Sequence, residues 1–552
     1  HPIPGAPKIS VVVPVYNTPV RFLRQMLNSV FRQSAPNWQL VLVDASDAAH
    51  GRVSRMVRRA ARDARVVCKK IENGGIAANT TEGFAMADGE YIALLDHDDV
   101  LYPNALYEIG KAIVQTGAKI VYTDEIVLSE NLRHLAAYHF KPDFSPDTLR
   151  GCNYIAHLLV FSRALLEQAG KEERPEFDGA QDHDLILRLT ERLRPEEIVH
   201  LPKCLYVWRS HPQSTAQSIE GAKAYALSAG ERAVDAQLAR LGLAGKTESI
   251  PGCPGAYRVR YALPENPQDG PLVSVIVRSG GEPAMTARCI ESLYAHAGSV
   301  SFEALLVEQG ARDERRAAYY RGAEERYPHL RVLWQDKPLS PAEAYNEGRR
   351  AARGAHLLFL RDGVEMLSDG FLDEMLMYSQ RPDVGCVGAK LFARDDTIRH
   401  AGLFLGVGGA VGVNHKGHPR ESMGDLYRLA TAQNMTAVGG GCVMVKAADF
   451  DAAGGFEETL FSDTYYEADL CLRLRRQGRW NVYTPFAQGY SYEDEGTGGA
   501  GAGDAARRAR ETEAFRARYA GELAGGDPFY NRHFTVRSED YSAKYECAIL
   551  ME

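Results

Sequence analysis

Short apolar runs alternate with stretches of helical periodicity in the first part of the chain. Residues 9–17 read ISVVVPVYN, residues 20–33 repeat apolar side chains with a helical period, and a second apolar run, WQLVLVDAS, begins at Trp38. Another helical stretch leads to a third run, EYIALLD, from Glu90. Strands that alternate with helices form a mainly parallel sheet, so the pattern predicts an α/β fold whose ligands bind beyond the carboxyl ends of the strands.

The same pattern occurs twice along the chain. VSVIVRSGG at residues 273–281 corresponds to ISVVVPVYN near the start. YNEGRRAARGAHLLFLRDGVE from Tyr345 corresponds to NTTEGFAMADGEYIALLDHDD from Asn79, and YEADLCLRL from Tyr466 corresponds to QDHDLILRL from Gln181. Because several segments match in the same order, the sequence predicts two copies of one domain.

The length of 552 residues agrees with this duplication, since one hydrophobic core rarely serves so long a chain. We expect a first domain over residues 1–215 and a second over residues 269–552. Residues 216–268, which include the turn-forming sequence PGCPG, would connect them.

Composition and charge narrow the class of protein. The chain is 45% apolar and 25% charged, as in an ordinary globular enzyme, and its net charge of −8 gives no reason to expect nucleic-acid binding. No apolar segment approaches the roughly 18–20 residues that span a bilayer, and HPIPGAPKIS lacks a signal-peptide core. We therefore expect a cytoplasmic protein whose association with the inner membrane face, if any, is peripheral.

The third apolar run ends in LLDHDD, which places Asp96, Asp98 and Asp99 around one histidine. Carboxylates this close repel one another unless solvent or a counter-charge compensates them. One interpretation is an exposed turn between a strand and a helix, because Pro103 follows and suits a first helical turn. The other is a site for a hard divalent cation that bridges to a diphosphate.

Polar residues also follow the first two predicted strands. Pro14, Tyr16 and Asn17 come after the first, where a nucleotide base could lie against the backbone and the aromatic ring. Asp44 ends the second, where its carboxylate could accept the N–H of a uracil or thymine ring. At the carboxyl ends of parallel strands, these residues and the LLDHDD acids would meet in one crevice.

Two later segments offer further candidates. Asp182 and Asp184 stand in the first turn of a predicted helix, where they could cap it and favour its dipole, or where one of them could be a general base beside the crevice. His211, in YVWRSHPQST, could be a packing residue or a ligand.

VPVYN, VDAS, LLDHDD, the QDHDL helix and WRSH, in this order, resemble the GT-A glycosyltransferases of family 2, which use nucleotide-sugar donors and invert the anomeric centre. KPDFSPDTLRGCNYIAHLLV and DPFYN resemble the tandem members that build bacterial surface polysaccharides, including rhamnose-containing O-antigens. The resemblance covers nearly the whole chain. It implies two tandem Rossmann-like GT-A domains, a UDP- or dTDP-linked sugar donor, and a glycan or lipid-linked glycan acceptor.

By position, the resemblance gives Asp44 the pyrimidine contact and makes Pro14, Tyr16 and Asn17 part of the nucleoside pocket. It also implies binding of the donor and of a Mn²⁺ or Mg²⁺ ion at the DxD motif. The residues implied there are Asp96 and Asp98, with Asp99 adjoining and His211 as a further metal ligand.

An inverting transfer needs a base on the face opposite the leaving diphosphate, because the acceptor hydroxyl attacks the anomeric carbon in line. The resemblance gives this role to Asp182, and it matches Trp208 and Asp124 to residues on the sugar and acceptor side. No covalent intermediate is needed, so no serine or cysteine nucleophile has to be found.

The second copy departs from this pattern. Only Asp362 and Glu365 remain as possible metal ligands, and no histidine occurs between His418 and His533. Glu467 stands at the base position and remains a usable base. The residue differs at four other positions. Arg278 replaces Pro14, Glu308 replaces Asp44, Arg361 replaces Asp96 and Gly363 replaces Asp98.

Arg361 would repel a cation at this position, yet it could clamp a diphosphate itself. The second copy is therefore either degenerate, binding acceptor or holding an assembly, or a second transferase with altered or metal-independent chemistry. Three other functions stay open for the whole chain: a bifunctional enzyme, a carbohydrate-binding scaffold, and a sugar-phosphate nucleotidyltransferase. The last normally needs a glycine-rich basic loop where this chain has VPVYN.

Overall fold

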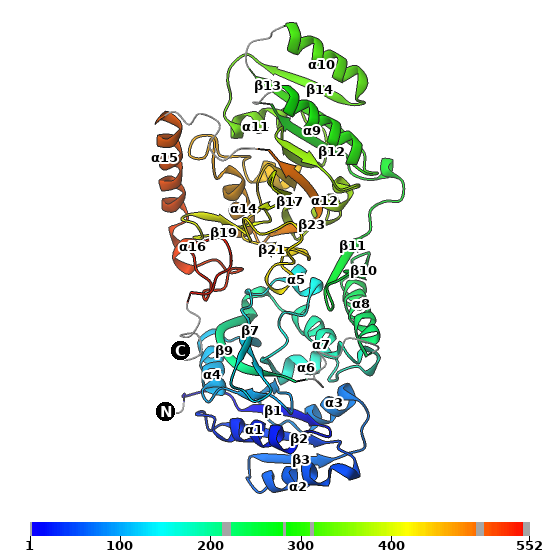
Figure 1. The fold of residues 1–552 in the computed structure, drawn as a ribbon, viewed down its shortest axis with the longest axis vertical. Helices are drawn as coiled ribbons and strands as arrows, with labels where there is room; N and C mark the ends of the chain where they lie inside the picture. The colour runs from blue at the N-terminus through cyan, green and yellow to red at the C-terminus, as the bar shows by residue number, and fades with distance from the viewer. Residues whose placement is uncertain (1–2, 212–221, 280–282, 310–313, 493–501, 545–552) are drawn as a thin grey trace. The chain divides into compact units, whose positions relative to one another are not determined.

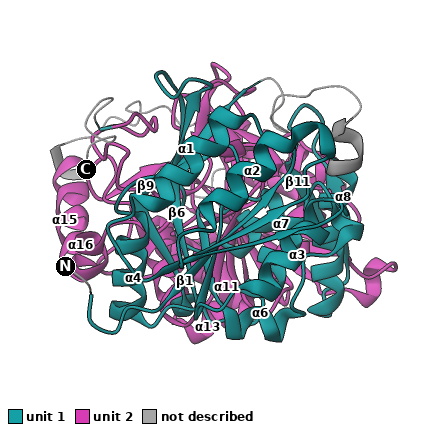
Figure 2. Ribbon diagram, turned by 90° about the horizontal axis from the view of Figure 1, so that it is seen from below, with its two compact units in different colours: residues 1–259, 544–552 teal, residues 260–543 magenta. Residues whose placement is uncertain are grey.

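In the computed structural model the chain forms two compact units, built mainly from residues 1–259 and 260–543 (Figure 2). The structure describes residues 3–211, 222–279, 283–309, 314–492 and 502–544. The first residues of the predicted connecting segment, 216–221, lie outside the described residues.

A mixed sheet forms the centre of the first unit, with strand order β3-β2-β1-β4-β8-β6-β9-β5 and β7 beside β6 (Figure 1). Its strands are β1 (Ile9–Val15), β2 (Trp38–Asp44), β3 (Val66–Lys70), β4 (Tyr91–Leu94), β5 (Val100–Leu101), β6 (Ile120–Ser129), β7 (Leu135–His139), β8 (Leu159–Ser162) and β9 (Ile198–Ser210). The four strands from β3 to β4 are parallel, whereas β8 runs antiparallel to both of its neighbours.

The expectation of a mainly parallel sheet holds for β6 with β9 and from β3 to β4, but β8 and β5 run antiparallel to their neighbours after β4. Strands and helices alternate strictly only up to that point. Afterwards β6 and β7 form an antiparallel pair, and an irregular stretch precedes β8. Such a stretch has no period from which the direction of the next strand could be predicted.

Two layers of helices cover the sheet because β1 is apolar on both faces. Val11, Val13 and Val15 belong to the core that includes apolar residues of α1, α2 and α4, while Val12 faces α3. The helices of the first unit are α1 (Val20–Phe31), α2 (Gly51–Ala60), α3 (Ile76–Met86), α4 (Ala105–Thr116), α5 (Pro146–Gly151), α6 (Arg163–Ala169) and α7 (Gln181–Thr190).

The segment predicted to connect the copies contains α8 (Ala222–Arg240) and the hairpin of β10 (Gly245–Ser249) and β11 (Tyr257–Tyr261). Helix α8 packs against the first unit, where Gln237 accepts a hydrogen bond from Arg150 and donates one to the carbonyl of Leu187 on α7. The proposed boundary at residue 215 stays a prediction.

The second unit repeats the topology of the first. Its sheet order is β14-β13-β12-β15-β22-β17-β23-β16, in which every strand occupies the place of its counterpart, and this confirms the predicted duplication. The strands are β12 (Val273–Arg278), β13 (Phe302–Gln309), β14 (Leu330–Gln335), β15 (His356–Arg361), β16 (Val364–Met366), β17 (Val384–Phe392), β18 (Ile398–His400), β19 (Leu403–Leu405), β20 (Val411–Val413), β21 (Gln433–Met435), β22 (Cys442–Lys446) and β23 (Trp480–Ser491).

Helices cover this second sheet as well. They are α9 (Pro283–His296), α10 (Glu314–Arg326), α11 (Pro341–Ala351), α12 (Phe371–Ser379), α13 (Ala447–Ala452), α14 (Tyr466–Arg476), α15 (Ala502–Arg518) and α16 (Ala520–Gly525). Within the described parts of both units, no helix combines the length and the apolar character needed to cross a membrane.

Close packing of α3 on β1 requires a glycine at position 83. An added methyl group there would overlap Val12, whereas one at Gly51 on α2 would meet open space. Alanine favours either helix by about 1 kcal/mol, but overpacking costs about 1–3 kcal/mol. We expect Gly83→Ala to lower the free energy of unfolding by about 1–2 kcal/mol and Gly51→Ala to leave it unchanged or raise it. Urea unfolding of both variants checks this, and equal stability would contradict the packing.

Candidate active site

The acidic turn after β4 brings three carboxylates together. One oxygen of each of Asp96, Asp98 and Asp99 lies within 4.8 Å of the other two, a separation that a single divalent cation can bridge. Strand β1 lies between β2 and β4, so the ends of these three strands form one edge of the sheet. The predicted nucleoside residues and the acidic turn therefore stand at the same edge.

Asp99 is the buried anchor of this turn. Its side chain accepts hydrogen bonds from the Tyr206 hydroxyl at 2.6 Å and the backbone N–H of Arg209 at 2.7 Å, both on β9. Only 1% of Asp99 is exposed, and this burial, followed by the charges of Asp96 and Asp98, raises its pKa well above the ordinary range. Asp99 thus fixes the turn against β9.

Asp98 pairs with the histidine that follows β9. The Asp98 carboxylate lies 2.8 Å from Nε2 of His211, and its backbone carbonyl accepts a hydrogen bond from Nε of Arg209 at 2.6 Å. The Arg209 guanidinium in turn lies 4.4 Å from the centre of the Phe22 ring. His211 and Asp98 could therefore act together as ligands.

Asp96 is the most exposed carboxylate of the cluster, with 45% of its side chain accessible. Nε2 of His157 lies 3.7 Å from it, and the His157 ring stacks on Tyr206 and meets Trp208 edge-on. Partial removal from water, and then the charge of Asp98, raise the pKa of Asp96 although His157 opposes this. His157 was missed as a site residue although it stands in the segment KPDFSPDTLRGCNYIAHLLV, because the resemblance of this segment gave no role to any single residue in it.

The two acids at the start of α7 have different environments. Asp184 is fully buried and pairs with both Arg174 and Arg188, so it holds the helix in place. Asp182 is partly exposed and accepts a hydrogen bond from the Asn153 amide at 2.9 Å. Its charge contributes to the raised pKa of Asp96, so the two carboxylates are near each other.

Glu173 is a further buried acid near Asp182 and Asp96 that sequence reasoning missed. It is 3% exposed, and its Oε2 has no hydrogen-bond partner among the described residues. Burial, and then the charge of Asp182, raise its pKa well above the ordinary range, whereas a hydrogen bond with Thr80 lowers it. The raised pKa favours the protonated carboxyl, which can donate a hydrogen bond.

The residues predicted to bind the nucleoside stand at the ends of β1 and β2. Asn17, with a positive φ of 49°, donates its backbone N–H to Ser46 and exchanges side-chain hydrogen bonds with Asp47, which joins the two loops. Pro14 is half-buried within β1, and the side chain of Tyr16 is exposed.

Asp44 ends β2 and is 2% exposed. Burial alone would raise its pKa, but hydrogen bonds from Ser54 and Ser46, with the charge of Lys70, hold the pKa below the ordinary range. Asp44 is therefore an anion at neutral pH, with Lys70 at 3.4 Å. Its contact with a base stays a prediction.

The interpretation of Asp124 as a residue on the sugar and acceptor side was wrong. Asp124 is 0% exposed, accepts a hydrogen bond from the backbone N–H of Lys141 and lies 2.9 Å from Nε2 of His200. It faces the interior because it sits midway along β6, where the side chain on that face is covered. The sequence could not show which face of the strand is buried.

The second unit has a different arrangement at the same edge. The Glu467 carboxylate accepts hydrogen bonds from the backbone N–H groups of Gly440 and Gly441, with N···O distances of 3.0 Å in both cases. Asp362 accepts a hydrogen bond from Thr286 on α9, and Glu365 accepts one from Tyr492. Within the described residues of this unit, no group of acids, histidines or cysteines comes close enough to hold a metal ion.

Comparison with protein-family models matches both units. Residues 10–167 match the model described as glycosyl transferase family 2, and residues 270–516 match the model described as glycosyltransferase like family 2.

Two curated relatives are similar over 97% of this chain. The uncharacterized protein y4gI of Sinorhizobium fredii is 38% identical over 541 residues, which cover 58% of that protein. The O-antigen biosynthesis protein RfbC of Myxococcus xanthus is 34% identical over 540 residues, which cover 41% of it. The chain therefore spans about half the length of these relatives.

Among solved structures, residues 1–349 of TarS from S. aureus in complex with UDP-GlcNAc are similar to this chain with a TM-score of 0.36 and 18% sequence identity. The match covers 42% of this chain and 66% of the TarS chain.

The contrast between the two acids of α7 gives a stability prediction. Asp184→Asn leaves the buried Arg188 and the partly buried Arg174 without their carboxylate, so we expect it to lower the free energy of unfolding by about 3–5 kcal/mol. Asp182→Asn keeps the hydrogen bond with Asn153 possible, so we expect a change below about 1 kcal/mol. Urea unfolding measures both, and a large loss in the Asp182 variant would show that Asp182 is structural.

Proposed function

The chain belongs to glycosyltransferase family 2, of which it carries two tandem domains, and we propose that its first unit is a metal-dependent, inverting sugar transferase. Both units have the α/β fold of the GT-A type, as the sequence predicted. The observation that carries the proposal is the convergence of Asp96, Asp98 and His211 with the charge of Asp182 on one crevice.

Asp96, Asp98 and His211 would hold a Mn²⁺ or Mg²⁺ ion, with Asp99 fixing the turn behind them. The fit rests on the donor set, since the oxygens lie within reach of one ion and the close carboxylates need a counter-charge. When bound, such an ion neutralises the charge that develops on a leaving diphosphate. Trp208 and His157 would line the sugar beside Asp96.

Asp182 is proposed as the general base. It would take the proton from an acceptor hydroxyl as that oxygen bonds to the anomeric carbon and the bond from this carbon to the diphosphate breaks. The Asn153 amide holds Oδ2 of Asp182, which orients the carboxylate for this step. Glu173, whose raised pKa favours the protonated form, would donate a hydrogen bond to a sugar or acceptor oxygen near Asp182.

Donor and acceptor classes follow from the same crevice and from the relatives. Asp44, Pro14, Tyr16 and Asn17 would bind the uracil or thymine nucleoside of a UDP- or dTDP-sugar. The similarity to an O-antigen biosynthesis protein supports a glycan or lipid-linked glycan acceptor in bacterial surface-polysaccharide synthesis. With a lipid-linked acceptor, the enzyme would act peripherally at the cytoplasmic face of the inner membrane.

A bifunctional enzyme is the second candidate, because Glu467 keeps a carboxylate at the base position of the second unit. One observation argues against a bifunctional enzyme. Both oxygens of the Glu467 carboxylate already accept hydrogen bonds from the backbone N–H groups of Gly440 and Gly441.

Nucleotide release from UDP- and dTDP-sugars tests the class of reaction. We expect release with Mn²⁺ or Mg²⁺ and an acceptor, and at least a hundredfold slower release in EDTA, because the repulsion among Asp96, Asp98 and Asp99 is then not compensated. Absence of release with every donor would favour a carbohydrate-binding scaffold. Equal rates in EDTA would contradict metal dependence.

Two variants of the first unit separate the proposed roles. We expect Asp98→Ala to weaken Mn²⁺ binding at least tenfold and to abolish transfer, because it removes one ligand and the partner of His211. Asp182→Asn should abolish transfer while Mn²⁺ affinity stays within threefold, because the charge lost lies across the crevice. Isothermal titration with Mn²⁺ and product analysis measure both, and transfer by Asp182→Asn at the normal rate would exclude it as the base.

One variant of the second unit tests the bifunctional alternative. We expect Glu467→Gln to leave at least one glycosidic linkage forming, because the base of the first unit is untouched. Linkage analysis of the product measures this, with Asp182→Asn as the comparison. Loss of every linkage in the Glu467 variant would show that the second unit is required for catalysis.

A further inference from the structure

Two arginines stand side by side at the crevice edge of the second unit. Arg278 ends β12 and Arg361 ends β15, and the two are register partners on adjacent parallel strands. Register partners point to the same face of a sheet, and neighbouring strands lie about 4.8 Å apart. Both side chains are half-buried. The pair therefore concentrates two fixed positive charges where the first unit has Pro14 and Asp96.

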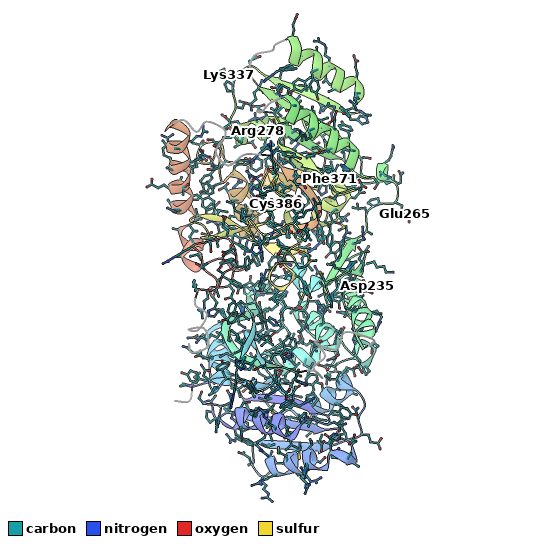
Figure 3. All side chains as sticks on the ribbon, viewed as in Figure 1. Asp235, Glu265, Arg278, Lys337, Phe371 and Cys386 are labelled. Carbon is teal, nitrogen blue, oxygen red and sulfur yellow. The ribbon has the colours of Figure 1, made fainter. Side chains whose placement is uncertain are left out.

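Arg278 is incompletely paired among the described residues, although the charge of Glu467 acts in the same neighbourhood. Figure 3 shows Arg278 within the second unit, near the end of β12. Its Nε is buried without a hydrogen-bond partner, and it forms no ion pair with any carboxylate that the structure describes. An Nε–H that is buried without a hydrogen-bond partner is costly, and a bound anion would satisfy it.

Neutral polar groups surround the two arginines. The buried Tyr345 hydroxyl and Nδ1 of His400 have no hydrogen-bond partner among the described residues, and both arginines act electrostatically on Tyr345 and Tyr466. Burial, and then the charge of Arg361, lower the pKa of His400 to about 3, so this ring is uncharged at neutral pH. It can still donate one N–H.

The run Gly439, Gly440 and Gly441 brings these groups together. Cβ atoms added at the three glycines would meet Glu467, His400 and Arg361 in turn, so the backbone lies directly against each of them. Gly440 and Gly441 have φ angles of 90° and 84°, a region that favours glycine. Because Glu467 is bound to the N–H groups of this run, it fixes the loop beside the arginines.

We propose that the crevice of the second unit binds a diphosphate group without a metal ion, held by Arg278 and Arg361. Arginine suits phosphate oxygens because its planar fork donates two parallel hydrogen bonds, and two adjacent guanidinium groups match two linked phosphates. The hydroxyl of Tyr345 and the N–H of His400 would provide further donors.

The first unit offers the opposite electrostatic arrangement. Its crevice carries Asp96, Asp98 and Asp182, which would repel a diphosphate unless a cation intervened. The diphosphate could belong to a nucleotide or to a lipid-linked glycan, and the chemistry of the phosphate contacts is the same for both. The proposal goes beyond the transfer reaction of the first unit and does not depend on it.

Binding of inorganic pyrophosphate to the full chain in EDTA tests the proposal. EDTA removes the cation that the first unit would require, so a failure of metal-dependent transfer and a failure of this site give separate results. We expect binding in the wild type and at least tenfold weaker binding in Arg278→Gln and in Arg361→Gln. Arg326→Gln on α10, whose side chain is 70% exposed, is the matched control and should bind as the wild type does.

Stability controls keep the result interpretable. Arg278→Gln removes an unpaired charge, so its melting temperature without ligand should equal or exceed that of the wild type. Tyr345→Phe removes one hydroxyl and should weaken pyrophosphate binding severalfold without unfolding the unit. No binding to the wild type in EDTA, or unchanged binding in Arg278→Gln, would overturn the proposal.

Two further ligands identify the source of the diphosphate. Tighter binding of UDP than of pyrophosphate in EDTA, lost in Arg278→Gln, would support a nucleotide. Tighter binding of farnesyl diphosphate, lost in the same variant, would support a lipid-linked glycan. Binding of either ligand that persists in Arg278→Gln and Arg361→Gln would place it elsewhere and count against the proposal.

Discussion

The buried carboxylate of Asp99 holds the crevice of the first unit together. It joins the turn after β4 to Tyr206 and Arg209 on β9, more than a hundred residues further along the chain. This connection brings Asp98 and His211 together, because Asp98 adjoins Asp99 and His211 follows Arg209 by two residues. In the second unit Val364 occupies the position of Asp99 and is 1% exposed, packed into the core. The fold accepts either a buried acid with two donors or an apolar side chain, and only the first choice orders an acidic turn.

The same strand order therefore carries opposite electrostatics in the two units. The first groups the carboxylates of Asp96, Asp98 and Asp99 in the turn after β4, whereas both units keep an acid near the end of the second strand, Asp44 and Glu308. The second has arginines at the ends of β12 and β15, and its acids are occupied by hydrogen bonds with the backbone or with side chains. Changing the charge at strand ends leaves the sheet intact because these positions lie at its edge. A duplicated domain can thus change its ligand chemistry without changing its core.

The sequence predicted those parts of the protein that leave a periodic or repeated signal. The duplication and the placement of Asp96 to Asp99 at a strand end were confirmed in the structure, because apolar periods show strands and parallel strands bring their ends together. His157, Glu173 and Asn153 could not be found, since they lie in irregular segments and reach the crevice only through tertiary packing. The antiparallel direction of β8 and the buried face of β6 could not be predicted from the sequence for the same reason.

The duplication also separates side chains that serve the fold from those that serve chemistry. Both copies keep an acid–arginine pair one helical turn apart, Asp184 with Arg188 and Asp469 with Arg473. Both copies also keep a buried serine on the first strand that accepts a glycine N–H, Ser10 from Gly89 and Ser274 from Gly354. These interactions persist whatever the crevice binds, so they stabilise the fold. Asp96 and Arg361 stand at equivalent strand ends and differ in charge, and the core does not constrain this difference because both side chains are only partly buried.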